Sequence, residues 1–339
     1  MTKKKNVNKI FIIFIFSHLF LWTLVPSITN LNLPLDTIEA LAWGSNLDWG
    51  YSKHPPLSAF AVEFFYKIFG NNDWAYYFLS QIFIIFSFFI VWKFSYEFLR
   101  NKNLSLFSVL LLEAIYFYNY TSPEFNVNVC QLPFWALTVY YSWKIYSKQN
   151  IHIKECILLG IFAAFGFLSK YLFIYLLVSI DLLFFYLIFV KKDRRYDHKY
   201  IIPLVVFIVL LIPHIFWLIK NDFITVSYGL HRSGLNEPNI IDHLKYPIIF
   251  FGKQIAILIP FFILASFIVS KLKFNMKFAD KKLFFLIVVN MLPIFLIFLT
   301  SLILGAKIRT MWMTPFYLFF GTLLVYIFQK NIDLKKIKN

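Results

Sequence analysis

The stretch LDTIEALAWG at residues 35–44, followed by YSKHPPL at residues 51–57, lies between the first two long apolar segments of the chain. It gathers two carboxylates, a lysine, a histidine and a proline pair in a sequence that otherwise consists of apolar segments long enough to span a membrane. Loops that carry such polar groups are where binding and chemistry are commonly found. We therefore expect the functional site here.

The composition sets the class of protein. Of the 339 residues, 60% are hydrophobic and 22% are aromatic, and the mean hydropathy is +0.69. Too little polar surface remains to coat soluble domains, and apolar windows of about 17–25 residues recur along the chain. We predict an all-α polytopic membrane protein with one membrane domain over residues 1–339.

The apolar windows predict about ten transmembrane helices. They fall near residues 10–28, 76–97, 105–119, 129–146, 155–169, 171–190, 201–219, 246–270, 283–304 and 311–329. Two sizeable external loops are predicted, the first at residues 29–75 and the second at residues 220–245. No soluble domain is expected after the last span.

The basic residues predict the orientation, because lysine and arginine are retained on the cytoplasmic side. Placing the N-terminus inside puts most of the 33 basic residues in or beside cytoplasmic segments. We therefore expect a multi-pass protein of a bacterial inner (plasma) membrane with both termini cytoplasmic. The same rule accounts for the net charge of +16, so membrane lipids are expected as partners and nucleic acid is not.

Local patterns predict two short helices within the first external loop. Asp36 followed three residues later by Glu39 fits a capping box at the start of a helix that ends at Gly44. A second helix is expected to begin at the Pro55-Pro56 pair. Two interfacial helices would hold the polar connection between them close to the membrane face.

Several motifs follow one another in a recognisable order along residues 10–328. They are Asp36, Glu39-Ala40, Trp43-Gly44, Asp48 to Gly50, Tyr51 and His54-Pro55-Pro56-Leu57, then Pro123 to Asn128, Gly166 to Tyr171, Pro213-His214 with Trp217, Asn221 to Phe223, His231-Arg232, and Arg309 to Trp312 with Thr314-Pro315. In this order they resemble the family 39 and related glycosyltransferases, which include protein O-mannosyltransferases and the bacterial aminoarabinose transferase. These are polyprenyl-phosphate-sugar-dependent enzymes of the C-type membrane fold.

The resemblance implies transfer of a sugar from a polyprenyl (undecaprenyl) phosphate onto an acceptor on the outer side of the membrane. Asp36 would then deprotonate or orient the acceptor, with inversion in a single displacement, and Glu39 would support the loop. The departing phosphate requires positive charge or hydrogen-bond donors. The residues that compete for it are Lys53, His54, Lys170 and Arg309.

Four further residues are expected near the substrate, namely Glu124, Asn128, His231 and Arg232. Amides at Asn126 and Asn128 largely replace an acidic residue of related enzymes, so a divalent metal has no support from ligand spacing. A divalent metal stays open, and no other cofactor is predicted. The identity of the sugar stays open. The acceptor also stays open and can be a glycan, a lipid or a protein.

Other interpretations of these residues stay open. Asp36 and Glu39 also suit a purely structural helix cap, and Lys170 also suits a side chain that extends to the headgroup layer. Glu113 and Asp181 lie within predicted spans, where an ionised carboxylate costs about 2.5–3.5 kcal/mol and should face a partner or be protonated. They support the alternative of a lipid-linked-sugar flippase or another transporter, although the chain shows no internal repeat.

Overall fold

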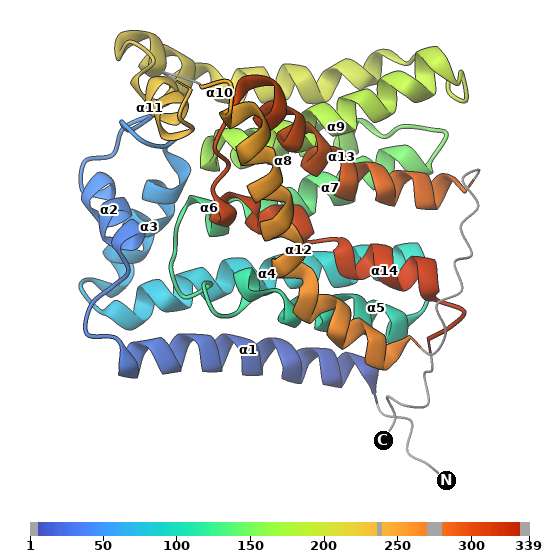
Figure 1. The fold of residues 1–339 in the computed structure, drawn as a ribbon, viewed down its shortest axis with the longest axis horizontal. Coiled ribbons are helices and arrows are strands. Elements are labelled where there is room, and N and C mark those ends of the chain that lie inside the picture. The colour runs from blue at the N-terminus through green and yellow to red at the C-terminus, as the bar shows by residue number, and fades with distance from the viewer. Residues whose placement is uncertain (1–5, 236–238, 270–279, 333–339) are drawn as a thin grey trace.

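The computed structural model describes residues 6–235, 239–269 and 280–332, and these are helical apart from turns, loops and one isolated bridge between Val269 and Ile332. The helices that make up its bundle lie side by side (Figure 1). They are α1 (Val7–Thr29), α4 (Asp73–Leu99), α7 (Leu132–Ser147), α8 (Ile153–Ser169), α9 (Ile174–Phe185), α10 (Ile202–Lys220), α12 (Asp242–Ile268), α13 (Lys281–Leu304) and α14 (Phe320–Phe328). Helix α12 crosses the others obliquely.

The remaining elements connect and cover these helices. They are α2 (Leu35–Gly44), α3 (Leu57–Phe69), α5 (Lys102–Leu110), α6 (Val127–Cys130) and α11 (Ile224–Arg232), the 3-10 turns η1 (Leu111–Ala114), η2 (Tyr116–Tyr118), η3 (Tyr171–Phe173), η5 (His198–Ile201) and η6 (Thr310–Tyr317), and the π turn η4 (Tyr186–Val190). Helices α2, α3 and α11 gather at one end of the bundle (Figure 1). This end therefore brings together the two loops that were predicted to be external.

Six helical stretches among the described residues are long and apolar enough to cross a membrane. They are Val7–Thr29, Asp73–Leu99, Tyr171–Val190, His198–Lys220, Asp242–Phe267 and Lys281–Leu304. A seventh results if η6 and α14, which are bent by 48° relative to each other, count as one span. The all-α class is confirmed, whereas the predicted count of ten is not, since α7 and α8 have only 16 and 17 residues.

The predicted span at residues 105–119 is wrong as a continuous helix. Helix α5 ends at Leu110, and the chain continues in two 3-10 turns. The side-chain amide of Asn119 donates to the backbone oxygen of Glu113 over 2.5 Å, which folds the chain back on itself. A polar side chain that bonds the backbone competes with the helical ladder, and apolar windows do not register this competition.

Both short helices predicted between the first two apolar segments are present, but α2 begins differently from the prediction. Its N-cap is Pro34, and Asp36 lies inside the first turn with no side-chain capping bond. The capping box is therefore wrong, and the Asp36 carboxylate is left available for other contacts. Helix α3 begins after Pro56 and ends at Gly70, whose φ of +63° suits glycine.

The core is rich in aromatic residues and centres on α4, which contacts α1, α5 and α7. Trp135 and Phe94 are fully buried within it. Cys130 and Cys156 are both buried as free thiols. Helix α14 approaches α5 so closely that a β-carbon on Gly321 would lie 2.0 Å from the backbone oxygen of Ser108. Small residues permit such close contacts between membrane helices.

We expect the Gly321→Ala substitution to lower the unfolding temperature of the detergent-purified protein. The added methyl group has to displace backbone, and overpacking of this kind costs about 1–3 kcal/mol. Gly252→Ala on α12 is the matched control, because a β-carbon there meets no atom within 4 Å. Thermal unfolding followed by size-exclusion chromatography measures both. Equal unfolding temperatures for the two variants would contradict the close α5–α14 contact.

Candidate active site

Helix α10 fixes the polar loop that joins α2 to α3. The indole Nε1 of Trp217 donates to Asp48 Oδ2 over 2.7 Å, and His214 Nδ1 lies 2.5 Å from the backbone oxygen of Trp49. The Trp217 ring also lies against Gly50, where a β-carbon would come within 2.3 Å of it. The loop therefore has a defined position, and only glycine fits at residue 50.

Three carboxylates lie together beside this loop. Helix α2 supplies Asp36 and Glu39, and the segment before α6 supplies Glu124. Glu124 Oε1 accepts the backbone N–H of Asp36 over 3.3 Å, and its Oε2 accepts a bond of 3.3 Å from Asn126. Asp36 is half-buried, so its carboxylate keeps access to an incoming molecule.

Burial raises the pKa of Asp36 above its ordinary value, and the nearby charge of Glu39 raises it further. The charges of Lys170, Lys53 and Arg232 act in the opposite direction on the same carboxyl. Burial and the neighbouring Asp36 likewise raise the pKa of Glu124. A carboxylate whose pKa is raised toward neutrality accepts a proton more readily than an exposed one.

Lys170 lies at the junction of α8 and η3 and is only 4% exposed. Its ammonium donates to Asn128 Oδ1 and lies 5.2 Å from the centre of the Trp312 ring. Burial lowers the pKa of Lys170 to about 7, against the raising effect of Asp36. The side chain therefore does not extend to a headgroup layer, and near neutral pH it is divided between its charged and neutral forms.

Lys53 and His54 differ in the charge that they offer. Lys53 forms an ion pair with Glu39, and this hydrogen bond raises the pKa of the lysine. Burial, together with the charges of Lys170 and Lys53, lowers the pKa of His54 to about 3. His54 packs edge-on against Trp43 at a ring distance of 5.8 Å. Its imidazole is therefore neutral at physiological pH and can serve only through hydrogen bonds.

Arg309 precedes η6, the turn that carries Trp312, and His231 and Arg232 lie at the end of α11. The backbone oxygen of Arg309 accepts the N–H of Trp312 over 3.0 Å, and its Nε is buried without a hydrogen-bond partner in the described part of the chain. Arg232 is exposed and within electrostatic reach of Asp36. His231 is also exposed, and across the described residues its side chain makes no contact with the carboxylates.

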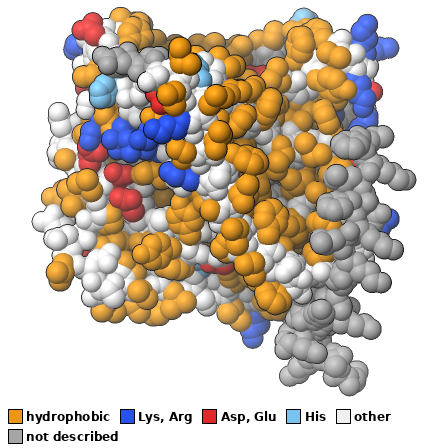
Figure 2. All heavy atoms as spheres, viewed as in Figure 1, with side chains coloured by type: hydrophobic (Ala, Val, Ile, Leu, Met, Phe, Trp, Pro, Cys, Tyr) orange, Lys and Arg blue, Asp and Glu red, His pale blue; other side chains and the backbone are white. Residues whose placement is uncertain are grey.

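Most of the predicted site residues are thus brought together. Figure 2 shows basic side chains directly beside acidic ones over the end of the bundle that carries α2 and α11. Sequence reasoning missed Tyr228, whose ring lies 6.0 Å from the Lys53 ammonium and packs against His54. A single tyrosine in a polar loop gives no sequence signal of this role.

The pocket between these residues is small, with a volume of about 10 Å³. It is lined by Asp36, Glu39, Ala40, Trp43, His54, Ser58, Asn126 and Val127. Such a volume suits about one water molecule, so any larger ligand would have to bind over the half-buried carboxylates. Within residues 6–235, 239–269 and 280–332, no group of three or more His, Cys, Asp or Glu side chains is arranged to hold a metal ion.

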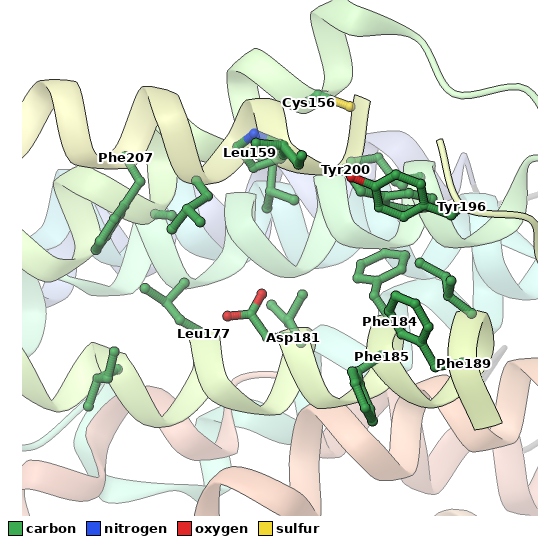
Figure 3. Close-up of a pocket in the computed structure, with 18 residues that line it drawn as sticks. Cys156, Leu159, Leu177, Asp181, Phe184, Phe185, Phe189, Tyr196, Tyr200 and Phe207 are labelled. Atoms are coloured by element: carbon green, nitrogen blue, oxygen red, sulfur yellow. The ribbon is translucent and has the colours of Figure 1, made fainter. Parts of the chain in front are cut away.

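The two acids of the transporter alternative lie in separate surroundings. Glu113 Oε1 is 2.5 Å from His18 Nδ1, and the other ring nitrogen of His18 is 3.1 Å from Gln81 Oε1. Asp181 lines an apolar cavity of about 390 Å³ between α8, α9 and α10, with its carboxylate directed into the space between helices (Figure 3). The two acids therefore do not face a shared polar path, and the transporter alternative is not favoured.

Comparisons with known proteins confirm the resemblance. Residues 53–217 match the family model described as dolichyl-phosphate-mannose-protein mannosyltransferase. An undecaprenyl phosphate-alpha-4-amino-4-deoxy-L-arabinose arabinosyl transferase from Wigglesworthia glossinidia brevipalpis is 29% identical over 206 residues, which are 56% of this chain and 36% of that protein. The chain thus resembles the polyprenyl-phosphate-sugar-dependent glycosyltransferases, as its first loop indicates.

The fold is similar to that of ArnT from Cupriavidus metallidurans. The crystal structure of ArnT bound to undecaprenyl phosphate matches with a TM-score of 0.69 at 11% identity, over 94% of this chain and 59% of that one. The apo structure matches with a TM-score of 0.68 at 10% identity, over 98% of this chain and 62% of that one. The chain spans less than two thirds of the length of each of these relatives.

Proposed function

We propose that this chain is a membrane glycosyltransferase that moves a sugar from a polyprenyl phosphate onto an acceptor. The observation that carries the proposal is the position of Asp36, a half-buried carboxylate on α2 within electrostatic reach of Lys170 and Lys53. Its support comes from the match of residues 53–217 to a mannosyltransferase family and from the fold shared with ArnT.

In the proposed reaction Asp36 orients the acceptor hydroxyl and takes its proton. The acceptor oxygen attacks the anomeric carbon as the bond between that carbon and the phosphate oxygen breaks, and the phosphate leaves with the electron pair. One displacement inverts the anomeric centre. The raised pKa of Asp36 suits this role, because a base whose pKa lies nearer to the working pH holds the proton more firmly.

The basic residues near the carboxylates would contribute unequally to binding the donor phosphate. Lys53 is already paired with Glu39, and the neutral imidazole of His54 offers only a hydrogen bond. Lys170 is the main charged ligand in this proposal, because among the described residues the half-buried Asp36 supplies its compensating negative charge, while Asn128 and Trp312 contact the ammonium without neutralising it. Arg309 has an unpaired buried Nε and would bind a second phosphate oxygen, a geometry that the guanidinium group favours.

The proposed setting is a bacterial inner membrane with both termini cytoplasmic. Helix α1 runs toward the end of the bundle that carries α2, α3 and α11 (Figure 1). A cytoplasmic N-terminus would then place the carboxylates, with α2 and α3 as interfacial helices, on the periplasmic side. The proposed partners are an undecaprenyl-phosphate-linked sugar and a glycan, lipid or protein acceptor, with no metal assigned a role.

We expect Asp36→Asn to reduce sugar transfer by about 10²-fold or more, since a positioned base contributes roughly 10²–10⁴-fold. Binding of undecaprenyl phosphate should persist, because the amide removes a negative charge that competes with the phosphate. Transfer is measured as release of undecaprenyl phosphate from a donor carrying 4-amino-4-deoxy-L-arabinose or mannose, and binding by native mass spectrometry. Asp73→Asn, an exposed acid at the start of α4, is the matched control.

Two results would contradict the proposal. Full transfer activity in Asp36→Asn would remove the aspartate from the mechanism. If the unmodified protein does not bind undecaprenyl phosphate, a polyprenyl-phosphate-linked sugar is excluded as its donor.

We expect the affinity for undecaprenyl phosphate to fall as the pH rises from 7 to 9. Lys170, whose pKa is about 7 in the free protein, is charged below this pH and neutral above it, and only the ammonium form attracts phosphate. The second ionisation of a phosphate monoester lies near pH 6, so the ligand hardly changes over this interval. Lys170→Arg keeps its charge and should flatten the profile. A flat profile in the unmodified protein would exclude Lys170 as the main ligand.

A further inference from the structure

The end of the bundle opposite to α2 and α3 contains a second polar pocket, of about 780 Å³. It lies between the ends of α4 and α7, the turn that follows η4, and the beginning of α13. Six basic side chains line it, namely Arg100, Lys144, Lys148, Arg194, Lys281 and Lys282, against two acidic ones, Glu97 and Asp193. The pocket therefore carries a clear excess of positive charge.

Several of these basic side chains already have partners within the protein. Lys144 pairs with Glu97, and Lys281 lies 3.3 Å from Asp193. Arg194 donates over 2.9 Å to the backbone oxygen of Ile145, near the end of α7. The Arg194 bond compensates the negative end of the α7 dipole, and Lys148 pairs with Glu155 over 2.6 Å. None of these contacts needs a ligand to explain it.

Arg100 differs from these residues because it lacks such a partner in the described part of the chain. It is exposed at the end of α4, and the described residues give its guanidinium neither an ion pair nor a hydrogen-bond partner. It lies within electrostatic reach of Lys282, a like charge that is itself bonded to the backbone oxygen of Phe98 over 2.7 Å. Asp280 also acts on Lys282 and partly compensates it, whereas no described acidic side chain pairs with Arg100. The two cations repel each other, so an added anion between them would be stabilised.

The backbone of Arg100 supports the same conclusion. Its φ is +54° at the C-cap of α4, a left-handed conformation that glycine adopts at least cost. Lys192, which lines an adjoining pocket of about 650 Å³, has a φ of +55°. The two pockets share Gln149, Asp193 and Arg194. At two helix ends the chain thus carries a cationic side chain where glycine would fit more easily.

The walls indicate an amphiphilic ligand. Beside the cations, the first pocket is lined by the rings of Trp143 and Tyr146 and by Leu187. It opens at the end of helices that are apolar enough to cross a membrane, where headgroups meet the protein. Figure 2 shows basic side chains at this end also, on the upper right. Basic pockets between membrane helices are suited to anionic headgroups.

We propose that this pocket binds the phosphodiester headgroup of an anionic phospholipid, with Arg100 and Lys282 contacting the phosphate and the aromatic wall contacting the glycerol and upper acyl chain. The site is separate from the carboxylates of α2, at the other end of the bundle. It does not depend on the proposed transferase activity.

The test uses the full chain, delipidated in detergent and titrated with phosphatidylglycerol, phosphatidylcholine or inorganic phosphate under native mass spectrometry. We expect saturable binding of phosphatidylglycerol and weaker binding of phosphatidylcholine. Arg100→Gly should weaken phosphatidylglycerol binding about five-fold, the loss typical of one basic residue near an anionic lipid surface. Glycine suits the φ at this position, so the fold is retained, and Arg100→Asn provides a second variant compatible with that backbone.

Lys154→Gln, an exposed lysine in the first turn of α8 outside both pockets, is the matched control for charge. Lys53→Gln at the opposite end should leave the binding unchanged. The proposal is overturned if Arg100→Gly binds as tightly as the unmodified chain, or if Lys53→Gln abolishes the binding. It is equally overturned if inorganic phosphate binds and phosphatidylglycerol does not, since the ligand would then be a soluble anion.

Discussion

The arrangement of the candidate site depends on one buried ammonium group, that of Lys170. A buried charge without compensation costs several kcal/mol. Three partners offset this cost, namely the side-chain amide of Asn128, the face of the Trp312 ring and the negative charge of Asp36. These three partners come from distant parts of the sequence. Helix α2, the start of α6 and the turn η6 therefore have to converge on the junction between α8 and η3.

The same constraint separates the roles of the two acids on α2. Glu39 is paired with Lys53, so this pair is nearly neutral and holds the loop. Asp36 forms no direct ion pair among the described residues and stays half-buried beside several cations. An anionic donor phosphate would join the ammonium of Lys170, and Asp36 would face the acceptor. In the proposed reaction Asp36 therefore acts on the acceptor, and Glu39 holds the loop through Lys53.

Much of this could be predicted from residue order, because prolines and glycines mark the bounds of α3 and an apolar composition marks a membrane bundle. The pairing of His18 with Glu113 could not, since these residues lie 95 positions apart and no local pattern encodes their contact. The same holds for Trp217 and Asp48, which lie 169 positions apart. The capping box failed because the N-cap of α2 is Pro34, two residues before the position that the Asp36–Glu39 spacing indicates.

We propose that a lipid phosphate binds beside Lys170 on the side that Asp36 faces. A cryo-electron microscopy structure of the full chain with undecaprenyl phosphate would locate this phosphate. We expect its density within hydrogen-bonding distance of the Lys170 ammonium, with the Asp36 carboxylate lining the same cavity. Density for the phosphate only at another place, such as the Asp181 cavity or the pocket around Arg100, would contradict it.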